Sequence, residues 1–151
     1  MKFSEMPYER PDLDAVKKQY SALTERLKVA GSYEEARAVF LEKEELDKHV
    51  QTLATLSHVR HSIDTRDAFY DTEAKFWNAA EPELQEYTQA WTRAMLDGAF
   101  RAQFAAQFGE LMFVNAEIEL KTFSPEIIPE LQQENELAQE YEKLLASAQI
   151  P

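Results

Sequence analysis

Two histidines and an aspartate, spaced three residues apart, are the side chains with the clearest capacity for chemistry in this sequence. His58 and His61 lie at i and i+3, so one face of a helix presents both imidazoles, and Asp64 follows at the same interval. As chemistry, this pattern predicts a three-ligand metal site. The alternative is two polar residues at the edge of a packed stripe, near a helix end where histidine is favoured. Because two-ligand spacings on helices often arise by chance, we favour the second interpretation.

The motifs that define complete catalytic centres are absent from the sequence. It contains no His-Glu-x-x-His, which supplies two zinc ligands and a general base, and no Glu-x-x-His of di-iron bundles. It has no cysteine nucleophile, and its three glycines stand too far apart to form a phosphate-binding loop. We therefore predict no catalytic, cofactor-binding or metal-ligating residue in this chain.

Paired carboxylates and a row of phenylalanines are the remaining candidates. Pairs such as Glu34-Glu35 and Glu44-Glu45 would need burial or close neighbours to act as acid and base, and charge runs on helices are usually solvated. The phenylalanines at positions 100, 104 and 108 could line a ligand pocket, but a row at helical spacing is more often core. We expect both features to be structural.

The composition limits the class of protein and its partners. Of the 151 residues, 44% are hydrophobic and 29% charged, which is typical of a globular protein. The formal net charge of −12 disfavours nucleic acid and anionic membranes as partners, since both attract cationic surfaces. The sequence shows neither the apolar core of a signal peptide nor a stretch long enough to span a bilayer. The lack of cysteine suits the cytoplasm, the location we predict.

The order of the elements follows from runs of helix-forming residues and from the helix-breaking residues between them. Good helix formers dominate long runs without turn signals, and the short alternating β-branched runs of strands are missing. We predict an all-α fold, an irregular antiparallel bundle of about six helices in a single domain, 1–151. An extended leader over 1–10 precedes helices expected at about 11–30, 32–63, 66–79, 82–97, 99–122 and 125–148.

Local signals set these boundaries. Gly31 ends the first helix, and Ser32 and Glu35 form a capping box for the second. The Glu81-Pro82 pair is expected to separate two helices, because proline disfavours helix at the residue before it. Gly109 falls inside the segment 99–122, where it marks a break or a close helix crossing.

The last predicted helix starts at Ser124-Pro125, a cap followed by a proline in the first turn. Its expected apolar face consists of Ile127, Leu131, Ala138, Tyr141, Leu145 and Ala148. Proline then forces Ile150 towards an extended conformation, as if the chain stops while entering a new element.

Four blocks of sequence are specific enough to indicate a family. They cover residues 3–11, residues 60–70 with the Phe76-Trp77 pair after them, residues 115–128, and residues 144–150. In order and without obvious gaps, they resemble the N-terminal region of oligoendopeptidase F-type enzymes, in the thimet-oligopeptidase-like group of zinc metallopeptidases. None of the blocks is a catalytic signature, so the resemblance indicates kinship rather than activity.

The resemblance implies a lobe of a larger, mainly helical enzyme. In this family two lobes flank a channel that admits short peptides, and the C-terminal lobe holds one zinc with a His-Glu-x-x-His helix and a later Glu. That region has no counterpart here, so zinc is implied for the parent enzyme and no cofactor for this chain. The implied partners are an oligopeptide substrate and the C-terminal catalytic lobe. The alternatives are a standalone helical interaction module and a homodimer formed through an exposed apolar patch.

Overall fold

The structure, a computed structural model, describes residues 3–148, and within that range it contains helices and no strand, which confirms the all-α prediction. The elements are the 3-10 helices η1 (Phe3–Glu5) and η2 (Pro125–Ile127), and the α-helices α1 (Leu13–Lys28), α2 (Tyr33–Ile63), α3 (Ala68–Asp97), α4 (Arg101–Phe108), α5 (Leu111–Thr122) and α6 (Ile128–Ser147). The Ile150-Pro151 pair lies outside the described residues. No helix in the described range is long and apolar enough to cross a membrane.

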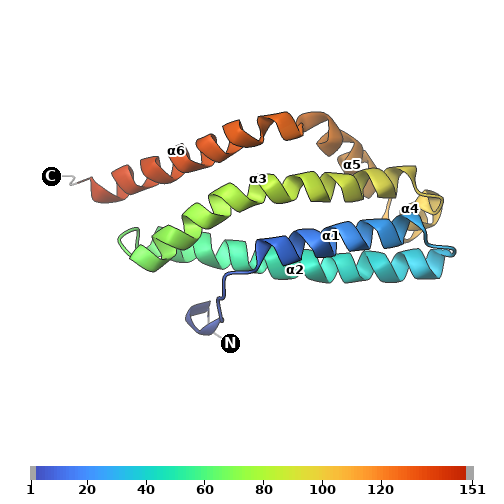
Figure 1. Ribbon diagram of the computed structural model, residues 1–151, viewed down its shortest axis with the longest axis horizontal. Helices are drawn as coiled ribbons and strands as arrows, with labels where there is room; N and C mark the ends of the chain where they lie inside the picture. Colours follow the sequence, from blue (N-terminus) through green and yellow to red (C-terminus); the bar gives the residue numbers. More distant parts are fainter. Residues whose placement is uncertain (1–2, 149–151) are drawn as a thin grey trace.

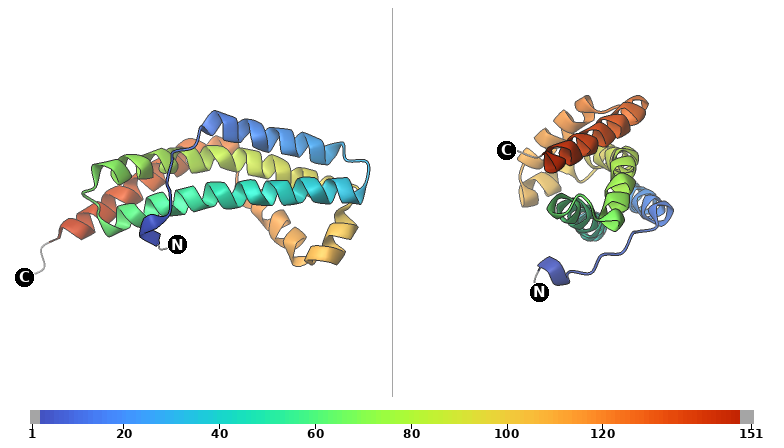
Figure 2. Two further views of the ribbon diagram at one scale, coloured as in Figure 1. Left: turned by 90° about the horizontal axis from the view of Figure 1, so that it is seen from below. Right: turned by 90° about the vertical axis from the view of Figure 1, so that its left-hand side faces the viewer.

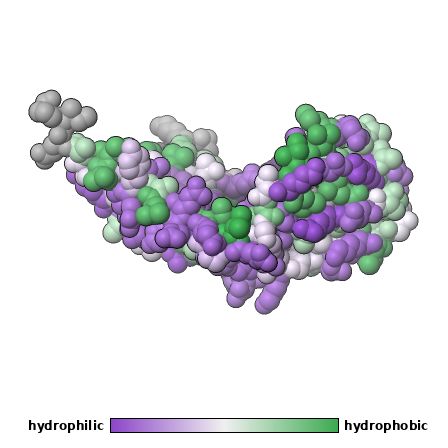
Figure 3. Space-filling model, turned by 90° about the horizontal axis from the view of Figure 1, so that it is seen from above, coloured by the Kyte–Doolittle hydropathy of each residue, from purple (hydrophilic) through white to green (hydrophobic). Residues whose placement is uncertain are grey.

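Helix α3 is the centre of the bundle. It packs against α1, α2, α5 and α6, while α1 and α2 also contact each other. Figure 1 shows α1, α2 and α3 running alongside one another, with α6 returning along α3. Helices α4 and α5 fold away from the long helices at one end (Figure 2). Figure 3 shows that the outline is hollowed between that end and the end at which α6 finishes.

Two hydrophobic clusters hold the bundle together. The first joins α4 and α5 to the long helices and includes Phe40, Trp91, Phe104 and Phe113. The second surrounds Trp77, whose side chain is 0% exposed between residues of α1 and α2. Phe104 is buried, which confirms that the central member of the predicted phenylalanine stripe belongs to the core.

Side-chain caps begin α1 and α2. The Asp12 carboxylate accepts a hydrogen bond from the Ala15 amide (3.1 Å), and the Ser32 hydroxyl accepts one from the Glu35 amide (3.2 Å). The Glu35 carboxylate accepts from the Gly31 amide at 2.8 Å, one residue earlier than in a standard capping box. These bonds satisfy backbone donors that have no partner within the helix.

The predicted separation of helices 66–79 and 82–97 is wrong, because α3 continues through Pro82. Proline lacks an N–H, so the carbonyl of Asn78, four residues earlier, loses its usual helical donor. The Asn135 side chain of α6 donates to that carbonyl at 3.1 Å, and Gln132 donates to the carbonyl of Ala79 at 2.8 Å. The neighbouring helix therefore compensates for the proline.

The predicted helix over 99–122 is two helices, α4 and α5, because the chain turns at Gly109. Gly109 has φ = +97°, a conformation that costs little only for glycine, and its amide donates to the carbonyl of Ala105 at 2.9 Å. The sequence marked this residue as a break or a close crossing, and the structure shows the break.

The leader is anchored to α3 through Glu73. Arg10 forms two hydrogen bonds with the Glu73 carboxylate (2.6 and 3.0 Å), and the Tyr8 hydroxyl donates a third at 2.6 Å. The hydrogen bond from Arg10 holds the pKa of Glu73 below its usual range, although burial acts in the opposite direction. Burial and the neighbouring Glu73 raise the pKa of Tyr8 to about 12, so its hydroxyl stays protonated and donates at neutral pH.

We expect this anchor to weaken in acid. Glu73 has a lower pKa in the folded state than in the unfolded state, where it is about 4.3, so its stabilisation is complete above that pH and is lost as the pH falls through the folded value. The difference in unfolding free energy between the protein and Glu73→Gln should therefore shrink from pH 7 towards pH 3. Urea denaturation at a series of pH values measures it. Glu9→Gln, at an exposed position, is the control, and an equal pH trend in both variants would contradict the assignment.

Candidate functional site

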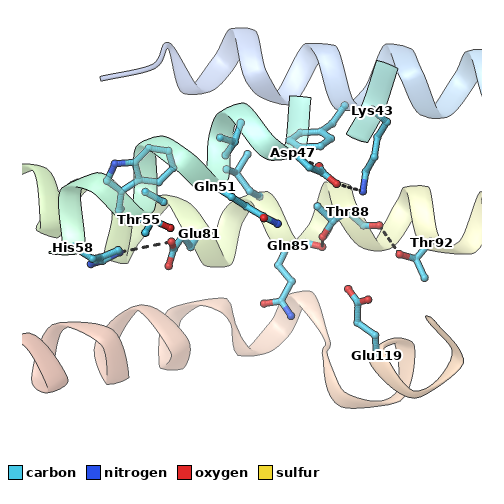
Figure 4. A pocket seen from close by; sticks show the side chains of 15 residues that line it. Lys43, Asp47, Gln51, Thr55, His58, Glu81, Gln85, Thr88, Thr92 and Glu119 are labelled. Carbon is cyan, nitrogen blue, oxygen red and sulfur yellow. Dashed lines mark hydrogen bonds and ion pairs between the residues drawn. The ribbon is translucent and has the colours of Figure 1, made fainter. Parts of the chain in front are cut away.

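A polar groove with a volume of about 580 Å³ runs between α2 and α3. Figure 4 shows that α2 and α3 supply most of its walls and that Glu119 reaches it from α5. Its floor is apolar and consists of Val50, Ala54, Trp77 and Leu84. The groove therefore combines a buried apolar floor with polar walls, the general composition of a ligand-binding cleft.

Helical spacing explains why the polar side chains meet in the groove. Residues three or four apart share one face of a helix, and each wall of the groove is one such row. The α2 row consists of Asp47, Gln51, Thr55 and His58, and the α3 row consists of Glu81, Gln85, Thr88 and Thr92.

Polar contacts lie at the two ends of the groove. At one end Asp47 contacts Lys43 (2.5 Å) and accepts a hydrogen bond from the Tyr20 hydroxyl (2.8 Å). At the other end the His58 imidazole lies 3.6 Å from the Glu81 carboxylate.

The middle of the groove offers free hydrogen-bonding groups. The Gln51 and Gln85 amides line it, and within residues 3–148 neither side chain has a hydrogen-bond partner. An amide carries both donors and an acceptor, the groups that pair with a peptide backbone. Glu81 and Glu119 add negative charge to the walls, so the groove suits a polar or basic extended ligand.

The structure does not bring His58, His61 and Asp64 together as metal ligands. His58 lines the groove, whereas His61 is 2% exposed and its burial lowers the pKa of the imidazole. Asp64 lies at the end of α2, where its carboxylate accepts from the Arg66 amide at 3.0 Å. In the described part of the chain, no three His, Asp or Glu side chains are grouped to hold a metal ion.

Sequence reasoning missed the groove residues. Gln51, Gln85 and Thr88 belong to no motif, and their spacing is also that of an ordinary solvated helix face. Glu119 reaches the groove only because Gly109 turns the chain before α5. No signal in the sequence distinguishes these residues from other polar positions.

Residues 3–148 therefore form an all-helical domain with a polar groove between α2 and α3. The family model for the peptidase M3 N-terminal domain matches residues 3–123, and the chain belongs to this family. This match confirms the family resemblance drawn from the sequence blocks.

Similar solved structures agree with this family assignment. A chain assigned as an oligoendopeptidase F is 39% identical with a TM-score of 0.96, over 99% of this chain and 26% of that one. PZ peptidase A, solved with an inhibitor, is 38% identical with a TM-score of 0.95, over 99% and 26%. A Bacillus anthracis protein assigned as an oligoendopeptidase F is 35% identical with a TM-score of 0.96, over 100% and 28%. Among curated proteins, none matches.

Proposed function

We propose that this chain acts as the N-terminal helical lobe of a zinc-dependent oligoendopeptidase. Its groove forms part of the wall of the peptide channel, and the zinc and its ligands belong to another part of the enzyme. The observation that carries the proposal is the close structural match to about a quarter of chains assigned as oligoendopeptidase F. In this role the chain positions the substrate, which accelerates a reaction by holding the reacting groups in the correct geometry.

The groove supports this role through its chemistry. The free amides of Gln51 and Gln85 face an extended ligand from opposite walls, and such pairing with a peptide backbone is independent of sequence. The carboxylates of Glu81 and Glu119 favour peptides with basic side chains. We place the enzyme in the cytoplasm, as expected from the sequence.

Peptide hydrolysis tests the proposal in two proteins. One is this chain alone, and the other is a chimaera in which it replaces the matched quarter of the oligoendopeptidase F relative. We expect no hydrolysis of a fluorogenic oligopeptide by the chain alone. The chimaera should cleave the peptide and lose activity with a chelator. Chelator-sensitive hydrolysis by the chain alone, or a folded, zinc-loaded chimaera without activity, would overturn the proposal.

The groove amides provide a sharper prediction in the same chimaera. Gln51→Ala combined with Gln85→Ala should raise KM several-fold and leave kcat nearly unchanged, because the lost contacts bind substrate and transition state alike. Gln19→Ala, at an exposed position on α1, is the matched control and should change neither constant. Unaltered kinetics in the double variant would show that the groove does not form part of the channel wall. A standalone interaction module would instead bind peptides without the catalytic part, as fluorescence anisotropy with the isolated chain would reveal.

A further inference from the structure

Helix α6 has the reverse of the usual arrangement of polar and apolar faces. Surface helices normally turn their apolar stripe towards the core. In α6 the only buried side chain is that of Gln139. Four large apolar side chains of the helix are exposed to solvent, by 57% for Leu137, 60% for Tyr141, 66% for Leu144 and 57% for Leu145. Figure 3 views the molecule from the side on which α6 lies and shows hydrophobic side chains along its surface.

The face of α6 that packs on α3 is a row of polar side chains. Gln139 accepts from the Asn78 amide at 2.6 Å and donates to the Asp71 carboxylate at 3.1 Å. Lys143 pairs with Asp71, while Gln132 and Asn135 donate to α3 carbonyls. These bonds fix the rotation of α6 about its own axis, because each needs its donor or acceptor to face α3.

This rotation leaves the apolar stripe on the outer surface. At 3.6 residues per turn, Leu137, Tyr141 and Leu144 lie about 140–160° around the helix from Gln139. The polar contacts with α3 and the apolar stripe therefore occupy opposite faces of α6. Because the polar face of α6 packs on the bundle, its apolar face is available to contact another surface.

The charges around the stripe indicate what covers it. Helix α6 carries five glutamates and one lysine, and that lysine pairs with Asp71. Two copies of the chain, each with a net charge of −12, would bring two acidic rims together, which opposes a homodimer at this face. A complementary surface is apolar at its centre and basic at its rim.

The comparisons point to the source of that surface. The family model for the N-terminal domain ends at residue 123, just after α5, so α6 lies beyond it. This chain covers 26–28% of the length of the related chains, so most of each related chain lies outside the matched part. We propose that the outer face of α6 docks against the catalytic part of the same peptidase, at an apolar surface with a basic rim. This inference rests on the proposed function and assigns the contact to Leu137, Tyr141, Leu144 and Leu145.

Oxidative labelling of Tyr141 tests the contact without a substitution. Hydroxyl radicals should modify Tyr141 readily in the isolated chain, since its ring is largely in water. In the chimaera with the oligoendopeptidase F relative, labelling should fall several-fold. Equal labelling in the two proteins would overturn the proposal.

A pair of substitutions tests it energetically. Leu137→Gln with Leu144→Gln should leave the Tm of the isolated chain nearly unchanged and lower that of the chimaera by several degrees. The control, Val29→Gln with Leu41→Gln, changes two exposed apolar side chains outside α5 and α6 and should be neutral in both proteins. Equal effects of the two pairs on the chimaera would overturn the proposal. So would self-association of the isolated chain that Leu137→Gln with Leu144→Gln abolishes, because a second copy would then be the occupant.

Hydrolysis by the unsubstituted chimaera separates this inference from the proposed function. An active chimaera whose Tyr141 remains exposed contradicts the docking face alone. A chimaera with a protected Tyr141 and bound zinc but no hydrolysis contradicts the proposed function alone.

Discussion

Replacing Trp77 with alanine should destabilise the protein by about 3–5 kcal/mol, the largest effect of any substitution described for this chain. The indole is 0% exposed and occupies the centre of the cluster formed by α1, α2 and α3. It also donates a hydrogen bond to the Tyr8 hydroxyl at 3.0 Å, which in turn donates to Glu73. Alanine would leave a cavity and remove a link between the leader and the bundle.

Chemical denaturation followed by circular dichroism measures this loss as a lower midpoint. Phe69→Ala is the matched control, because Phe69 is an aromatic residue of the same helix that is 55% exposed and contacts Tyr8 and Tyr70 only through ring edges. It should cost about 1 kcal/mol or less. If the two variants lost the same stability, Trp77 would not be the centre of the cluster.

The Asn135 side chain should contribute about 1–2 kcal/mol, and this contribution should depend on Pro82. Asn135→Ala removes the donor to the Asn78 carbonyl, which Pro82 leaves without a helical partner. In the background of Pro82→Ala, the amide of residue 82 can donate to that carbonyl, so the same substitution in α6 should cost much less. The two changes should therefore be coupled by about 1 kcal/mol.

A double-mutant cycle by urea denaturation measures the coupling. Gln133→Ala, at an exposed position on the same helix, should be neutral in both backgrounds. Additive effects of Asn135→Ala and Pro82→Ala would show that α6 does not compensate for the proline. Such a result would also weaken the argument that polar contacts set the rotation of α6.

Much of the fold was predictable because its signals are local. The cap at Ser32 and the break at Gly109 each act within a few residues, so the sequence records them directly. The all-α class follows in the same way from the helix formers that dominate the chain. The four blocks of sequence likewise indicated the family, and the family model and the related structures confirm that resemblance.

The groove could not be predicted, because its walls come from separate helices. Gln51 and Gln85 each lie on an ordinary polar helix face, and they line one groove only because α2 and α3 pack side by side. For His58 and His61, by contrast, the sequence showed a pattern that the folded structure does not turn into a site. Their spacing places them on one helix, but packing buries His61 and leaves His58 beside Glu81.

The sequence by itself determined where most helices begin and end, the acidic charge, and the lack of a catalytic motif. Tertiary structure alone decided that α3 runs through Pro82 and that α6 turns its apolar face outward. The physical reason is the same in both cases. Periodicity shows that a helix has a polar and an apolar face, but the partner that each face meets lies far away in the chain. The donor for Asn78 is 57 residues along the chain, at Asn135, and only the folded bundle brings the two together.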